Sequence, residues 1–316
     1  MVRARSRVAD LALTASGRLA QVAPCDDVPA GRVVELPGRG TTYLTDTGAP
    51  PGAGAQAPTV LLLHALGCTG LLTWYPSIAA LRSRYRLVTF DQRWHGQGIQ
   101  SPRFTLADCA DDVAAVADLL GLDRVLVAGY SMGSLVAQLA WRRHPDRLLG
   151  AVLCASTTRF VDSARDPRVL RLVAERTARA AAGQLSRRAA MPWAPGADPN
   201  RWAMSQFRST TGRRMTAATA EISMFDSTSW IGEMDVPTAV VVTARDRLIA
   251  PDRQRRLVRS LPYATSYEVE AGHAACVLGA HRFTPALLAA CASVSVRSAD
   301  RAARRAPGPA AVRAQP

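Results

Sequence analysis

Gly129-Tyr130-Ser131-Met132-Gly133 connects an apolar stretch, Arg124 to Ala128, to residues that favour a helix from Ser134 onward. This order predicts a buried strand that turns directly into a helix. Such a turn holds its central residue at positive φ, and glycine is favoured two positions away on either side because a side chain there would collide with the strand or the helix. The Ser131 hydroxyl would project at the positive end of a helix, where negative charge is stabilised. We therefore predict that Ser131 is a nucleophile; a chance glycine turn is the alternative.

A serine hydroxyl needs a base, and the base needs a group that orients it. Asp246 follows an apolar strand predicted from Thr238 to Val242, and His273 follows a strand predicted from Ala264 to Glu270. Parallel strands end at one edge of their sheet, so both side chains are expected at the edge that carries Ser131. A turn-forming aspartate and a loop histidine are the alternatives for each residue taken singly. The order and spacing together predict a triad.

These features resemble the α/β-hydrolase superfamily over about residues 31 to 296. That family uses Ser, Asp and His in this order along the chain, which implies a catalytic triad of Ser131, Asp246 and His273. The resemblance also implies a doubly wound, mostly parallel sheet of about eight strands with a helical cap insertion, as in serine esterases and lipases. A serine at the elbow argues against haloalkane dehalogenases and epoxide hydrolases, which use aspartate there.

The same resemblance implies an oxyanion hole made of two backbone N–H groups. Pro58 to Gly67 is expected to form a short strand and a tight turn, where the family supplies one donor. By this match the donors are the Leu66 and Met132 N–H groups. The family usually has His-Gly in the turn, and this chain has His64-Ala65, whose methyl group could move the Leu66 amide. His64 is interpreted as a structural hydrogen-bonding residue.

The segment from Asp91 to Gly98 resembles the family's Asp-x-Arg-Gly-His-Gly-x-Ser segment, with Trp94 in place of the first glycine. We interpret Asp91, Arg93 and His95 as structural and keep Trp94 as a candidate substrate contact. The five histidines do not have metal-ligand spacing, and no close cysteine pair occurs. We therefore predict no metal and no cofactor.

Residues 157–235 form a long insertion rich in Arg and Ala, predicted to be a helical cap between the two parts of the core, 31–156 and 236–296. Helix is expected over Val169 to Ala190 and again over Arg201 to Phe225. The candidate pocket residues here are Trp202, Met204 and Phe207. Packing of these side chains onto the core is the alternative for each of them.

The chain is 316 residues long with 48% hydrophobic content, which suffices for one large core. Its net charge is +14, and all 39 of its Lys and Arg residues are arginine, a bias typical of GC-rich coding sequence. Because no nucleic-acid motif accompanies this charge, we predict no nucleic-acid partner. A crossover helix is expected from Leu106 to Leu120, with solvated carboxylates at Asp108, Asp111, Asp112 and Asp118.

The two ends are expected to lie outside the core. Residues 1–30 read as a basic extension that could form an amphipathic helix, which leaves peripheral membrane contact as an alternative, and residues 297–316 read as a disordered basic tail. No stretch approaches the roughly 20 apolar residues that span a bilayer. With six cysteines that show no disulfide framework, a cytoplasmic location is expected. Two of them, Cys68 and Cys276, flank the predicted site.

The sequence thus predicts a serine hydrolase that cleaves a carboxylic ester, thioester or lactone through an acyl-enzyme. An acyltransferase with the same triad is the first alternative, because only the acceptor differs. A ligand receptor without activity is the second, disfavoured because all three triad members are present. The substrate is expected to be a small acyl compound; its identity and the oligomeric state do not follow from the sequence.

Overall fold

The computed structural model describes residues 22–23, 28–53, 57–160 and 190–305. In this part of the chain the strands form one eight-stranded sheet in the order β1-β2-β4-β3-β5-β6-β7-β8. β1 and β2 pair antiparallel, as do β2 and β4, and all other neighbours are parallel. The strands are β1 Arg32–Leu36, β2 Gly40–Asp46, β3 Thr59–Leu63, β4 Arg86–Phe90, β5 Val125–Tyr130, β6 Leu148–Cys154, β7 Thr238–Thr243 and β8 Ala264–Val269.

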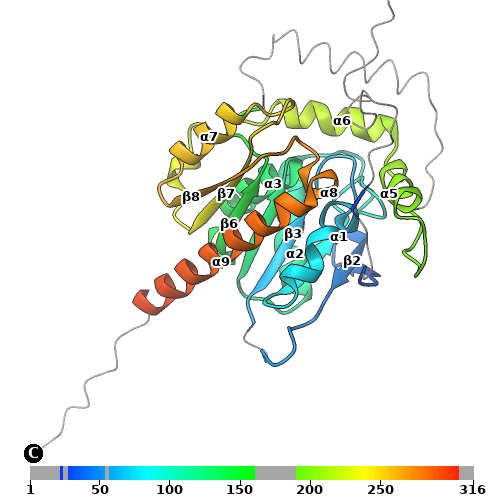
Figure 1. The fold of residues 1–316 in the computed structure, drawn as a ribbon, viewed down its shortest axis with the longest axis horizontal. Coiled ribbons are helices and arrows are strands. Elements are labelled where there is room, and N and C mark those ends of the chain that lie inside the picture. The colour runs from blue at the N-terminus through cyan, green and yellow to red at the C-terminus, as the bar shows by residue number, and fades with distance from the viewer. Residues whose placement is uncertain (1–21, 24–27, 54–56, 161–189, 306–316) are drawn as a thin grey trace, which may run out of the picture.

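The helices connect these strands and flank the sheet (Figure 1). They are α1 Gly70–Leu81, α2 Leu106–Leu119, α3 Met132–Arg143, α5 Pro199–Arg208, α6 Gly212–Ser223, α7 Pro251–Ser260, α8 Ala275–Leu278 and α9 Ala280–Arg305. The predicted fold class, a doubly wound and mostly parallel sheet of about eight strands, is confirmed.

The central strands are apolar along their whole length because both faces of the sheet are covered. In β5, Val125 and Val127 join the core beneath α2, α3 and α7, whereas Leu126 and Ala128 join the core beneath α1 and α9. This alternation follows from the two-residue period of a strand. It places the strand ends, where the candidate residues lie, between two packed layers.

Two expectations from the sequence are wrong. Asp112 is fully buried rather than solvated, since it pairs with Arg39 and Arg93. The tail predicted to be disordered from residue 297 is helical as far as Arg305, because α9 continues there. Arg297 donates to the Thr238 carbonyl of β7 at 2.8 Å, which fixes the helix to the sheet.

Other expectations fall on residues outside the described ranges. These are most of the N-terminal extension, residues 306–316 and, apart from its last residue, the helix predicted over Val169 to Ala190. The helix predicted over Arg201 to Phe225 is observed as two helices, α5 and α6. Within the described ranges, no helix has both the length and the apolar character needed to cross a membrane.

Candidate active site

Ser131 stands at the turn between β5 and α3 with φ of 52° and ψ of −114°. Few residues other than glycine adopt positive φ, so this conformation is strained and must be held by its surroundings. The Ser131 N–H donates to the Cys154 carbonyl of β6 at 2.9 Å, and the Ser131 carbonyl accepts from the Ser134 N–H at 2.9 Å. The turn predicted from the sequence is therefore present.

The two glycines of the turn are required by close backbone approach. A Cβ atom on Gly129 would collide with the Gly133 carbonyl oxygen, and one on Gly133 would collide with the Leu63 carbonyl oxygen. The latter would also lie 2.9 Å from the His64 carbonyl oxygen. The start of α3 is thus packed directly against the end of β3, which brings Ser131 close to the turn that follows β3.

Asp246 lies in the loop after β7 and is 5% exposed. Its Oδ1 accepts from the Leu248 and Ile249 N–H groups at 2.8 and 2.9 Å, and its Oδ2 accepts from the Thr243 hydroxyl at 2.8 Å. Burial alone would raise the pKa of this carboxyl group, but the bonds from His273, Ile249 and Thr243 outweigh it, so the net pKa is lowered. The carboxylate form is therefore favoured.

His273 lies between the other two predicted residues. Its Nδ1 is 2.7 Å from Asp246 Oδ2, and its Nε2 is 2.9 Å from Ser131 Oγ. Because an ionised carboxylate only accepts hydrogen bonds, Nδ1 carries the proton, which leaves Nε2 free to accept from the serine hydroxyl. This is the geometry in which an imidazole can take the hydroxyl proton.

Two residues that support this arrangement were not predicted from the sequence. The Tyr130 hydroxyl donates to the His273 carbonyl at 2.8 Å and so anchors the histidine loop. Gln254 on α7 is fully buried and donates to Asp246 Oδ2 at 3.2 Å. For Gln254 the sequence did offer a signal: it is a glutamine on the buried face of the helix that follows the acidic residue. Buried polar side chains need hydrogen-bond partners.

The predicted oxyanion donors lie at the turn after β3 and at the first residue of α3. The first N–H groups of a helix have no partner within the helix, which includes that of Met132. Within the described ranges, neither the Leu66 nor the Met132 N–H has a hydrogen-bond acceptor. Ala65 has no positive φ, so its methyl group causes no backbone strain in the turn.

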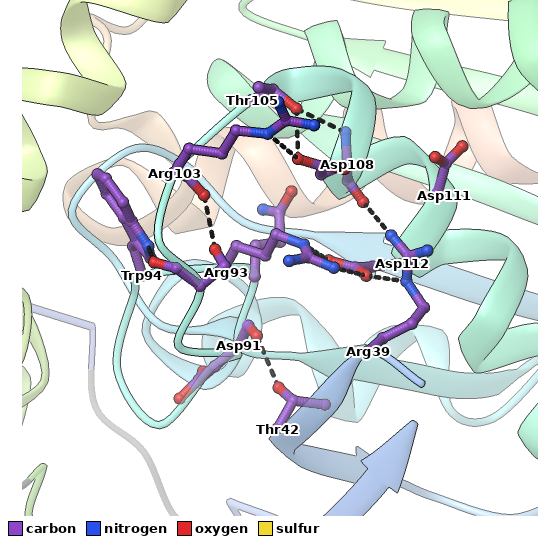
Figure 2. Close-up of polar contacts among 12 residues, drawn as sticks. Arg39, Thr42, Asp91, Arg93, Trp94, Arg103, Thr105, Asp108, Asp111 and Asp112 are labelled. Atoms are coloured by element: carbon purple, nitrogen blue, oxygen red, sulfur yellow. Dashed lines mark hydrogen bonds and ion pairs between the residues drawn. The ribbon is translucent and has the colours of Figure 1, made fainter. Parts of the chain in front are cut away.

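The loop after β4 is held by polar contacts, and Figure 2 shows Asp91 and Arg93 among them. Asp91, Arg93 and His95, interpreted as structural from the sequence, all have such contacts. Asp91 accepts from the Gly70 and Gln97 N–H groups at 2.9 and 2.8 Å. Arg93 donates to Asp112 at 2.9 Å, and Arg39 from the β1–β2 turn binds the same carboxylate. His95 Nδ1 lies 2.8 Å from the Arg93 carbonyl oxygen.

Trp94 occupies a position with φ of 65°, which explains why glycine is usual there. Its indole N–H donates to the Ser101 carbonyl at 2.8 Å, and its ring packs against Phe104 with centroids 5.6 Å apart. The side chain therefore packs within its own loop, away from the Arg93–Asp112 pair (Figure 2).

The other predicted pocket residues lie on α5 and differ in exposure. Trp202 is 1% exposed and packs edge-on against Tyr75 and Trp193. Met204 and Phe207 are 41% and 48% exposed. A Cβ atom on Gly67 would lie 3.4 Å from Phe207 Cε2 and 2.6 Å from Met215 Cε of α6, so these two side chains lie over the turn that carries Leu66.

Cysteine and metal chemistry have little support near these residues. Burial raises the pKa of the Cys68 thiol to about 11 and also raises that of Cys276, which disfavours the thiolate. Across the described ranges, no group of three or more His, Cys, Asp or Glu side chains is arranged to hold a metal ion.

Comparisons with known proteins agree with this geometry. The family model for the alpha/beta hydrolase fold matches residues 58–280. A pimeloyl-[acyl-carrier protein] methyl ester esterase from Chromobacterium violaceum is 31% identical over 233 residues, which cover 69% of this chain and 88% of that protein. The crystal structure of an enol-lactonase from Burkholderia xenovorans LB400 is similar with a TM-score of 0.65 and 26% identity, covering 83% of this chain and all of that one.

Some further relatives match over shorter stretches of the chain. The 3-oxoadipate enol-lactonase 1 of Acinetobacter baylyi is 40% identical over 82 residues, which cover 26% of this chain and 30% of that protein. Curated relatives from Caulobacter vibrioides are 39% identical over 105 residues, and the chain spans 38% of their length. The family model matches most of the chain, and the match to the esterase covers 88% of that protein. This chain belongs to the alpha/beta hydrolase family.

Proposed function

We propose that this protein hydrolyses a carboxylic ester or lactone through an acyl-enzyme formed on Ser131. The observation that carries the proposal is the position of His273, within hydrogen-bond distance of both Ser131 Oγ and Asp246 Oδ2. A nucleophile, a base and a group that orients the base are the minimum set for acyl transfer through serine.

In the proposed reaction Ser131 Oγ attacks the substrate carbonyl while His273 Nε2 takes the hydroxyl proton. Asp246 holds the imidazole in the required tautomer and stabilises its positive charge. The tetrahedral intermediate collapses when the imidazolium protonates the leaving alcohol. Water then attacks the acyl-enzyme by the same route and releases the acid and the free Ser131.

The negative charge that forms on the carbonyl oxygen requires fixed donors. The Leu66 and Met132 N–H groups are proposed for this role, because both lack acceptors among the described residues and both belong to segments packed together through Gly133. One such donor is worth about 10² to 10³ in turnover in serine hydrolases.

Similar proteins support an acyl substrate. One relative is named for hydrolysis of a methyl ester and another for hydrolysis of an enol-lactone. Both names describe cleavage of a carbonyl–oxygen bond, which is the chemistry that the residues around Ser131 can perform. Water is the proposed acceptor, and transfer to an alcohol or amine is the alternative, since each of them can attack the same acyl-enzyme.

Residues 157–235 are proposed to form a cap that selects the substrate, inserted between core segments 31–156 and 236–296. Its helix α5 is bound to the core where the Thr69 hydroxyl donates to Gln206 Oε1 at 3.0 Å. Figure 1 shows α5 and α6 outside the sheet, with α5 beside α1. With Phe207 and Met215 over Gly67, this cap would form an apolar wall beside the oxyanion turn.

The test uses purified protein, a panel of p-nitrophenyl esters and lactones, and a fluorophosphonate probe. Wild-type protein should turn over at least one substrate and be labelled at Ser131. Ser131→Ala should keep its melting temperature and lose turnover by on the order of 10³-fold or more. Ser77→Ala is the matched control, because Ser77 is also buried but contacts Thr284. Near wild-type turnover in Ser131→Ala would exclude the proposal, and product analysis with added alcohol separates hydrolysis from acyl transfer.

A further inference from the structure

Side chains from two other segments hold the turn between His64 and Leu66. Gln92, which follows β4, contacts it twice. Its backbone N–H donates to His64 Nε2 at 2.8 Å, and its side-chain amide donates to the His64 carbonyl at 2.9 Å. The His64 ring and the His64–Ala65 peptide are therefore both fixed by one residue.

The bond to Nε2 determines the tautomer of His64. Because Nε2 accepts, the ring proton lies on Nδ1, which donates to the Ala65 carbonyl at 2.8 Å. The Cys68 N–H donates to the same carbonyl at 3.1 Å. Burial, and next the neighbouring His95, lower the pKa of His64 well below its usual range, so the neutral ring that can both accept and donate is favoured.

Thr73 on α1 fixes the remaining group of Ala65. Its hydroxyl oxygen accepts from the Ala65 N–H at 3.2 Å, and the side chain is fully buried. The His64 carbonyl, the Ala65 N–H and the Ala65 carbonyl are thus all bound. In a trans peptide the N–H points opposite to the preceding carbonyl, so the Leu66 N–H faces away from the His64 ring.

Gln92 is an unfavourable choice for packing alone. It is 1% exposed, and its Oε1 has no hydrogen-bond partner among the described residues. A buried acceptor without a partner is destabilising, whereas an apolar side chain of similar length would leave no such atom. The side-chain amide of Gln92 is therefore better explained by its N–H group, which binds the His64 carbonyl.

We infer that Gln92 and Thr73 are positioning residues, Gln92 acting through His64, that fix the Leu66 N–H as a donor of the oxyanion hole. The inference rests on the proposed function, in which that N–H binds the oxyanion. It also accounts for Ala65 where the family usually has glycine, because side chains from the loop after β4 and from α1, rather than a special φ angle, set the peptide orientation.

The test compares Gln92→Met, which keeps length but removes the donor, with Thr73→Val, which keeps shape but removes the acceptor. Steady-state kinetics on one ester are combined with inhibition by a trifluoromethyl ketone. Ser131 Oγ adds to the carbonyl carbon of this inhibitor, the C=O electron pair moves to oxygen, and the serine proton passes to His273. The adduct therefore measures oxyanion binding without a leaving group.

Both variants should lower kcat by about 10-fold to 100-fold, with KM changed less than about twofold. The loss of kcat is smaller than for complete removal of one oxyanion donor, because the Leu66 N–H is displaced and not removed. The inhibition constant should rise by the same factor as kcat/KM falls. Thr73→Ser, which keeps the hydroxyl, should restore both values, and Ser77→Ala on the same helix should change neither.

Folded variants with unchanged kcat and inhibition constant would overturn the inference while leaving the proposed function intact. A rise in KM alone would also overturn it, because that pattern indicates ground-state binding. Wild-type protein that is inactive on every substrate and unlabelled at Ser131 would overturn the proposed function and this inference with it. If Gln92→Met does not fold, the comparison of Thr73→Val with Thr73→Ser decides.

Discussion

Asp246 Oδ2 lies 2.7 Å from His273 Nδ1, although the two residues are on separate loops that follow β7 and β8. The carboxylate is also bound by the Leu248 and Ile249 N–H groups, so its orientation is fixed before the histidine contributes. Two other aspartates that precede β7 are bound elsewhere: Asp226 pairs with Arg159, and Asp235 pairs with Arg301.

For Asp246→Asn we expect normal folding and a loss of roughly 10²-fold to 10⁴-fold in kcat, because the amide favours the wrong imidazole tautomer. Steady-state kinetics with an ester substrate measure the effect. Asp235→Asn is the control and should keep its kcat. If the two variants behave alike, Asp246 does not orient the base.

A second prediction concerns the buried carboxylate of Asp112, which binds both Arg39 and Arg93. Asp112→Asn should lower the free energy of unfolding by about 3 to 5 kcal/mol, since it leaves a guanidinium group buried without its counter-charge. Urea denaturation measures the change. Asp118→Asn on the same helix is the control: that side chain is 64% exposed and pairs with Arg147, so its loss should cost less than about 1 kcal/mol. Equal effects would contradict the electrostatic explanation.

The sequence was sufficient to predict the fold and the meeting of Ser131, Asp246 and His273. Each follows an apolar segment, and parallel order brings the carboxyl ends of such strands to one edge of the sheet. These signals are local, and the topology follows from them. The catalytic role of the three residues stays a prediction until it is tested on the protein.

Contacts between distant segments could not be predicted in the same way. Asp112 looks solvated within its own helix, and only the tertiary fold brings Arg39 to it from 73 residues away. The roles of Gln92 and Gln254 likewise follow only from their hydrogen-bond partners in the fold. The end of α9 looks disordered by composition, but Arg297 and Ser298 bind carbonyl groups of the core and extend the helix.

A third prediction concerns stability at acid pH. His95 is fully buried, and burial, only partly offset by its bond to the Arg93 carbonyl, lowers its pKa from 6.5 to about 4. The unfolded chain therefore binds a proton between these pH values that the folded chain does not. Stability is complete above pH 6.5 and falls as the pH decreases toward 4, by about 1.4 kcal/mol per pH unit for this group.

Denaturant titrations at several pH values measure this slope. His95→Asn, which can retain the donor to the Arg93 carbonyl, should flatten it by about that amount. His281→Asn is the control for the loss of a histidine on the exposed surface. The buried His64 adds a slope of the same sign, so the His95 variant retains part of the acid sensitivity. An identical slope in wild type and His95→Asn would contradict the assignment.

The last prediction separates selection of the substrate from packing within the proposed cap. Phe207 and Met215 lie over Gly67, beside the turn that carries Leu66, and Phe207 is about half exposed. Phe207→Ala and Met215→Ala should therefore shift the ratio of kcat/KM between long-chain and short-chain p-nitrophenyl esters by about 10-fold, since a few methylene contacts are worth 1 to 3 kcal/mol. Fluorophosphonate labelling of Ser131 should survive in both.

Trp202→Ala should instead lower stability by about 3 to 5 kcal/mol, because its ring is buried between Tyr75 and Trp193. Met224→Ala is the control, since Met224 is 72% exposed at the end of α6. If chain-length preference shifts only in Trp202→Ala, or if the Phe207 and Met215 variants match Met224→Ala, then these helices do not form the wall of the acyl site.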